Sequence, residues 1–179
     1  MLINFLAIVG AILALFLGYV AVTKSGKFHY ERSGVIQTAP DVIFPYLARF
    51  TLGGEWSPYE KTDPDMKKYL AGEDGEVGST MVFEGNSKAG SGKLELLRKS
   101  PNEEVLIRFT MIKPFKADNL VIYRLMPESD GTRFTWSMSG DGGFMHKIMV
   151  TLIDCDKLIG DQFDEGIQNL KTIMEAKQK

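Results

Sequence analysis

The first 22 residues limit the possible folds of this chain more than any other feature, because they carry no charged side chain. They are mostly Leu, Ile, Val, Ala, Phe and Gly, and Asn4 is the one strongly polar residue. As a helix, this segment would be roughly 33 Å long, which is enough to cross about 30 Å of hydrocarbon. We therefore predict a transmembrane helix over residues 1–22, with Tyr19 near a membrane interface.

A cleaved signal peptide is the alternative interpretation of residues 1–22. Signal peptides begin with basic residues, whereas no Lys or Arg precedes the apolar segment here. They also carry small residues before the cleavage site, and Ala21-Val22-Thr23 matches this pattern poorly. The sequence therefore favours an uncleaved membrane anchor.

The charges that flank this segment indicate its orientation. Lys24, Lys27 and Arg32 all follow it, so the positive-inside rule places the rest of the chain in the cytoplasm. The single cysteine, Cys155, cannot form an intramolecular disulfide, which fits a reducing compartment. We expect a single-pass membrane protein whose C-terminal domain lies on the cytoplasmic side of a bacterial inner membrane.

Composition and spacing argue against several kinds of site. The net charge is −2 and no stripe of Lys and Arg is present, so we expect no nucleic-acid partner. Zinc-type ligand spacing is absent, so we expect no metal or cofactor, and we place His29 and His146 at the surface or at strand edges. His146 and Cys155 fall on opposite faces of one predicted helix and cannot act as base and nucleophile. No complete catalytic constellation is present, so an enzyme is not the favoured interpretation.

The rest of the chain has the pattern of one domain, residues 28–179, joined to the apolar segment by a polar linker over residues 23–27. Alternating apolar residues predict a first strand over residues 28–37. Pro40 then opens a short helix, where its missing N–H is harmless. Residues 55–66 contain two prolines and can form only short helices and turns.

A run of strands and a long helix complete the domain. Asp130-Gly131 between two alternating segments is a strong hairpin signal. From Gly143 the apolar period changes to 3.6 residues, which predicts one long helix reaching Met174, with a kink or break at Gly160. This order of elements indicates an α+β fold. The strands before the helix are predicted over residues 67–71, 78–85, 91–99, 104–112, 117–127 and 131–140.

Several motifs resemble those of a known superfamily. Residues 35–44 are similar to its opening motif, I-x-A-P-x-x-V-F, and residues 159–171 are similar to its closing helix, with Ile167 in place of the usual leucine. Over roughly residues 28–175, the chain resembles the SRPBCC superfamily, with the START and birch-pollen-allergen type of helix-grip fold, and within it the polyketide cyclase/dehydrase-like group. Further matching positions are residues 55–60, 75–78 and 113–115, and Gly131-Thr132 leading into Trp136 and Gly140.

The resemblance implies that a curved antiparallel sheet wraps around the long C-terminal helix and that an apolar cavity lies between them. Members of the superfamily bind lipids, sterols, polyketides and other hydrophobic molecules, and some are enzymes. Trp56 fits a core position beneath the long helix at least as well as a cavity entrance, and Tyr59 fits either. The candidate cavity-lining residues are Trp56, Tyr59, Phe83, Phe109, Tyr123, Trp136, Met138, Met149 and Ile153.

Three functions are compatible with this pattern. The favoured one is a membrane-anchored domain that holds a hydrophobic small molecule or lipid. The second is a cyclase/dehydrase-type enzyme in which Glu60, Tyr59 or Tyr123 moves a proton, although the acidic residues between Glu55 and Asp65 fit turn chemistry better. The third is a membrane-associated interaction protein with a vestigial cavity.

Overall fold

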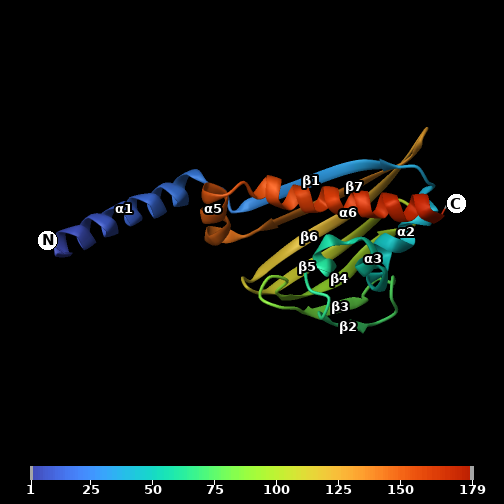
Figure 1. Cartoon of the computed structure of the whole chain (residues 1–179), viewed down its shortest axis with the longest axis horizontal. Helices are drawn as coiled ribbons and strands as arrows, with labels where there is room; N and C mark the ends of the chain where they lie inside the picture. Colours follow the sequence, from blue (N-terminus) through green and yellow to red (C-terminus); the bar gives the residue numbers. More distant parts are fainter. Residues whose placement is uncertain (1, 178–179) are drawn as a thin grey trace.

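A long apolar helix opens the computed structural model, which describes residues 2–177. This helix, α1 (Leu2–Thr23), projects away from the rest of the molecule (Figure 1). Within the described residues, it is the one helix long and apolar enough to cross a membrane. The helix predicted at the N-terminus is therefore present, and Met1 lies outside the described residues.

The remaining elements form one sheet with helices packed against it. The seven strands pair antiparallel in the order β1-β7-β6-β5-β4-β3-β2. Every predicted strand is present, and the ends differ from the prediction by at most two residues. The elements after α1 are β1 (Lys27–Ile36), α2 (Pro40–Ala48), the 3-10 helix η1 (Phe50–Leu52), α3 (Gly53–Trp56), α4 (Pro58–Lys61), β2 (Lys67–Ala71), β3 (Thr80–Glu84), β4 (Ser91–Ser100), β5 (Glu104–Lys113), β6 (Ala117–Glu128), β7 (Gly131–Asp141), α5 (Gly143–Leu152) and α6 (Cys155–Lys177).

The sheet curves around α6, which confirms the helix-grip α+β fold (Figure 1). Two glycines let the helix and the sheet approach closely. A Cβ on Gly34 of β1 would lie 2.8 Å from Cγ2 of Ile167, and a Cβ on Gly166 of α6 would lie 2.5 Å from the Trp136 ring. Both distances are too short for a real side chain, so these positions require glycine as packed.

The register of the strands defines which side chains face α6. Residues that are paired across neighbouring strands share a face of the sheet. Tyr123 pairs with Trp136, and Trp136 pairs with Arg32. We call the face that carries Trp136 the concave face. Its buried apolar residues are Tyr30, Ile36, Met81, Leu96, Val105, Ile107, Val121, Leu125, Phe134 and Trp136.

The prediction of one C-terminal helix broken at Gly160 is wrong. The chain breaks at Ile153, which is extended (φ −137°, ψ 153°) and separates α5 from α6. Asp154 then caps the start of α6, because its Oδ1 accepts a hydrogen bond from the Lys157 backbone N–H at 2.9 Å. Gly160 stays helical, and its role is steric: a side chain there would overlap the Arg32 guanidinium.

We predict that Gly166→Val lowers the free energy of unfolding by about 2 kcal/mol, because an overpacked core must shift rigid side chains. The added methyl groups would meet the ring of Trp136, which is buried and cannot move aside. Urea unfolding followed by circular dichroism measures the change. Glu165→Val is the matched control, since Glu165 is exposed on the same helix and the substitution there costs only the helix propensity, about 0.5 kcal/mol. Equal losses in the two variants would contradict the close packing.

Candidate functional site

An aromatic cluster fills the space between the middle of α6 and the sheet. Trp136 stacks on Phe163 with ring centroids 4.3 Å apart and planes 11° apart. Trp56 meets Trp136 edge-on at 5.2 Å, Tyr123 at 5.6 Å and Phe134 at 6.1 Å. Trp56 and Trp136 are only 2% and 3% exposed. Three of the candidate cavity residues, Trp56, Tyr123 and Trp136, are therefore packed into the core.

Tyr59 lies at the edge of this cluster. Its ring contacts Trp136 edge-on at 6.2 Å, and the residue is 39% exposed. Burial raises the pKa of both Tyr59 and Tyr123, so both hydroxyls stay protonated near neutral pH and cannot act as bases there. Glu60, the third residue of the enzyme hypothesis, is paired with Lys68.

Several apolar residues on the concave face nearer to α5 are only half-buried. The Phe83 and Phe109 rings stack at 6.2 Å, and the Phe83 ring lies over Gly92, where a Cβ would be 2.8 Å from it. Phe109 pairs with Leu94, and Tyr30 pairs with Met138. We call this set the half-buried patch; it consists of Phe28, Phe83, Leu94, Phe109 and Met138. It contains three of the candidate cavity residues: Phe83, Phe109 and Met138.

The break between α5 and α6 forms a pocket of about 550 Å³. We call it the elbow pocket. Tyr30 of β1 lines it and pairs with Met138 of the half-buried patch, so the two features adjoin. The candidate residue Ile153 lines this pocket and is exposed, whereas Met149, one turn earlier, packs against the core. The pocket is lined by Tyr30, Val150, Thr151, Leu152, Ile153, Asp154, Cys155 and Asp156.

Tyr30 is the most unusual polar residue of this pocket. It is 7% exposed, and its hydroxyl has no hydrogen bond of ordinary geometry among the described residues. Burial, with the nearby Cys155 thiol, raises the pKa of Tyr30 to about 12. Burial likewise raises the pKa of the Cys155 thiol, so Cys155 is not an activated nucleophile.

His146 lies against the same region, whereas we had expected it at the surface or at a strand edge. Its ring contacts Phe28 at 4.8 Å and Tyr30 at 6.3 Å, and burial lowers its pKa. His29 is exposed and lies 3.5 Å from Glu31, as expected for a surface residue. His146 and Cys155 belong to two helices rather than one, because the break at Ile153 separates them. Among residues 2–177, no cluster of His, Cys, Asp and Glu could hold a metal ion.

The sequence analysis missed Phe28, Tyr30 and His146. Phe28 and Tyr30 occupy alternate positions of the first strand, so their shared face could have been recognised from the period of two. The place of His146 could not, because it depends on the break that turns α5 away from α6.

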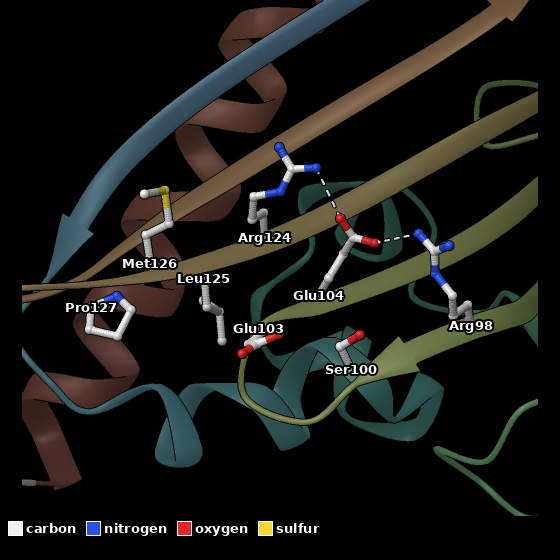
Figure 2. A pocket seen from close by; sticks show the side chains of 8 residues that line it. All are labelled: Arg98, Ser100, Glu103, Glu104, Arg124, Leu125, Met126 and Pro127. Carbon is white, nitrogen blue, oxygen red and sulfur yellow. Dashed lines mark hydrogen bonds and ion pairs between the residues drawn. The ribbon is translucent and has the colours of Figure 1, made fainter.

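A second pocket, of about 510 Å³, lies at the other end of the sheet. Figure 2 shows the carboxylate of Glu104 between the guanidinium groups of Arg98 and Arg124. The hydrogen bonds, 2.7 Å from Arg98 and 2.9 Å from Arg124, lower the pKa of Glu104. These charges compensate one another on the face opposite Tyr123, so this pocket is a weak candidate for an apolar ligand. Its lining is completed by Ser100, Glu103, Leu125, Met126 and Pro127.

We predict that Tyr30→Phe changes the pH dependence of stability. The folded chain holds the phenol proton more tightly than the unfolded chain, in which the pKa is about 10. The stabilisation is therefore complete below pH 10 and is lost as the pH rises through about 12. The free energy of unfolding of the wild type should fall relative to Tyr30→Phe by an amount on the order of 2 kcal/mol at saturation. Urea unfolding of both chains between pH 8 and pH 12 measures this, and parallel curves would contradict it.

A family model described as "Polyketide cyclase / dehydrase and lipid transport" matches residues 27–175. This range contains the sheet, α2 to α5 and nearly all of α6. A comparison with curated proteins gives no match.

Solved structures share the fold at low sequence identity. The di-domain ARO/CYC protein StfQ from the steffimycin biosynthetic pathway is 8% identical, with a TM-score of 0.64 over 85% of this chain and 52% of that one. The major latex-like protein 151 of Panax ginseng is 12% identical, with a TM-score of 0.58 over 83% and 97%. The Aha1 dimer of Colwellia psychrerythraea is 16% identical, with a TM-score of 0.58 over 83% and 96%. These structures show the shared helix-grip fold, and the family match establishes that the chain belongs to the polyketide cyclase/dehydrase and lipid transport family, which has the SRPBCC-type fold.

Proposed function

We propose that this chain is a membrane-anchored domain that binds a hydrophobic small molecule or lipid on its concave face. The observation that carries the proposal is the half-buried patch, a set of inward-facing apolar side chains that the protein itself does not cover fully. Large apolar side chains left in contact with water on one surface are typical of binding sites. The match to a family whose description includes lipid transport supports the same class of ligand.

The binding surface in this proposal combines the half-buried patch with the elbow pocket. The aromatic cluster closes the concave face beneath the middle of α6, so a ligand would enter from the side of α5. The patch offers apolar contact. Two buried polar residues adjoin it: Asn119, which pairs with Phe109, and Tyr30, which pairs with Met138. A phenol and an amide in an otherwise apolar surface suit a ligand with a small polar group on a long apolar body.

The anchor places this binding surface close to a source of lipidic ligands. α1 joins β1 through only three residues, 24–26, and its C-terminal end is held to α5. The domain would therefore stay within a few nanometres of the bilayer, and the effective concentration of membrane-derived ligands would rise. Lys24 and Lys27 follow the apolar helix directly, so we place the domain on the cytoplasmic side.

We predict that Phe83→Asp and Phe109→Asp each weaken binding of an apolar fluorescent probe, such as a pyrene-labelled fatty acid, by about tenfold or more, since a carboxylate in the patch must lose its hydration. Fluorescence titration of the chain in detergent-free nanodiscs, corrected for empty discs, measures the affinity. Tyr69→Asp is the matched control, because Tyr69 is an exposed aromatic residue of β2 on the opposite face of the sheet. Unchanged affinity in both patch variants, with folding intact by circular dichroism, would refute the proposed site.

We also predict that the full chain stays in the membrane fraction after an alkaline carbonate wash and keeps residues 1–22 by intact mass. An impermeant maleimide should label Ser87→Cys, in the exposed turn between β3 and β4, only after the membranes of spheroplasts are opened. A mature chain lacking residues 1–22 would show that the segment is a signal peptide. Labelling in sealed spheroplasts would reverse the orientation.

A further inference from the structure

Helix α5 presents three different sides. His146 and Val150 face the sheet, where His146 contacts the Phe28 and Tyr30 rings. Lys147 holds the end of α1, since its Nζ donates a hydrogen bond to the Ala21 carbonyl at 2.9 Å. At about 100° per residue, Phe144, Met145, Ile148 and Leu152 share the remaining arc. We call these four residues the outer face of α5.

The outer face is apolar and exposed. Phe144 is 44% exposed, Met145 is 45% exposed and Leu152 is 66% exposed. The arc lies opposite the side that carries His146 and Val150, so it points away from the sheet. Apolar side chains grouped in this way on one side of a helix are typical of an interaction surface.

The position of α5 identifies what covers this surface. Figure 1 shows α5 between α1 and the sheet, with its axis running across the axis of α1. Val20, in the last turn of α1, is fully buried, and the two helices are joined by the Lys147 hydrogen bond. If α1 crosses a bilayer, as the proposed function requires, α5 must lie at the bilayer surface and parallel to it.

Charge at the same end of the domain fits such a surface. The turn between β5 and β6 lies at the end of the sheet where β1 begins, because Asn119 pairs with Gly140 and Gly140 pairs with Phe28. In this turn, Phe115 is 53% exposed between Lys113 and Lys116. Lysines beside exposed apolar residues complement the anionic headgroups and the apolar boundary of a bilayer.

We propose that α5 is an interfacial helix whose outer face is embedded in the headgroup layer of the bilayer that α1 spans. This contact fixes the orientation of the domain, so that the elbow pocket, whose lining begins in α5 at Val150, opens beside the lipid. The inference rests on the proposed membrane anchor.

The test places an environment-sensitive fluorophore on the outer face of α5 in the full chain. Met145→Cys and Leu152→Cys, each labelled with NBD, are reconstituted in vesicles of phosphatidylcholine and phosphatidylglycerol, with and without spin-labelled phosphatidylcholine. Both probes should show blue-shifted emission and lose intensity when the spin-labelled lipid is present. Val77→Cys is the control, because the exposed fraction of Val77, 57%, lies between those of Met145 and Leu152. Val77 follows Gly75, where an added Cβ would lie 3.8 Å from the Ala48 carbonyl oxygen at the end of α2. This end of the domain lies away from α1 (Figure 1). The unmodified chain, whose Cys155 is buried, controls for labelling.

Three results would overturn the inference. In the first, the probes at positions 145 and 152 emit as they do in water while the chain resists a carbonate wash. This result would support the anchor but contradict the interfacial helix. In the second, the wash releases the chain from the membrane, which would contradict both the anchor and the interfacial helix. In the third, the probes are shielded from water but are not quenched by the spin-labelled lipid, and Met145→Cys forms disulfide-linked dimers. This result would show that a second copy of the chain covers this face instead.

Discussion

The stack of Trp136 on Phe163 is the contact on which the rest of the structure depends. At a centroid distance of 4.3 Å, it joins the middle of α6 to β7, in the half of the sheet next to the β1 edge. Trp56 completes the contact from α3, and its Nε1 donates to the Tyr46 carbonyl at 2.9 Å, so α2 and α3 are held to the same point. Because α6 cannot move away from the sheet here without breaking this cluster, any space for a ligand must lie to one side of the cluster or the other.

The two sides of this contact differ. Toward α2, the concave face is sealed, because Ile36, Leu96, Val105 and Phe134 are buried completely. Toward α5, the residues of the half-buried patch are not fully covered, and the chain between α5 and α6 is extended rather than helical. The break at Ile153 thus has a structural consequence: a continuous helix would carry residues 143–152 straight on along the axis of α6, whereas the break turns α5 across the end of the sheet.

The sequence predicted the strands well and the closing helix poorly, for a physical reason. The strands repeat every two residues, and that period is visible in Phe134, Trp136 and Met138 without any knowledge of what they contact. Gly160 looked like a helix breaker because glycine disfavours helices on average, but only the structure shows that Arg32 occupies the space of its side chain. Among the candidate site residues, composition could not separate Trp136, which is sealed in the core, from Met138 two positions later, because their burial depends on where α6 begins.

The half-buried patch has an energetic cost that the proposed function would explain. Full burial of a large apolar side chain is worth about 1.5–3 kcal/mol, and the half-buried Phe83, Phe109 and Met138 each forgo part of it. Helix α5 packs on the sheet only through the side that carries His146 and Val150, and Lys147 holds it to the end of α1. On the proposed function, the ligand supplies the missing burial of the patch, and on the interfacial placement of α5, the bilayer covers the outer face of α5. On the proposed anchor, the contact between α5 and α1 would hold the patch near the bilayer, where apolar molecules are abundant.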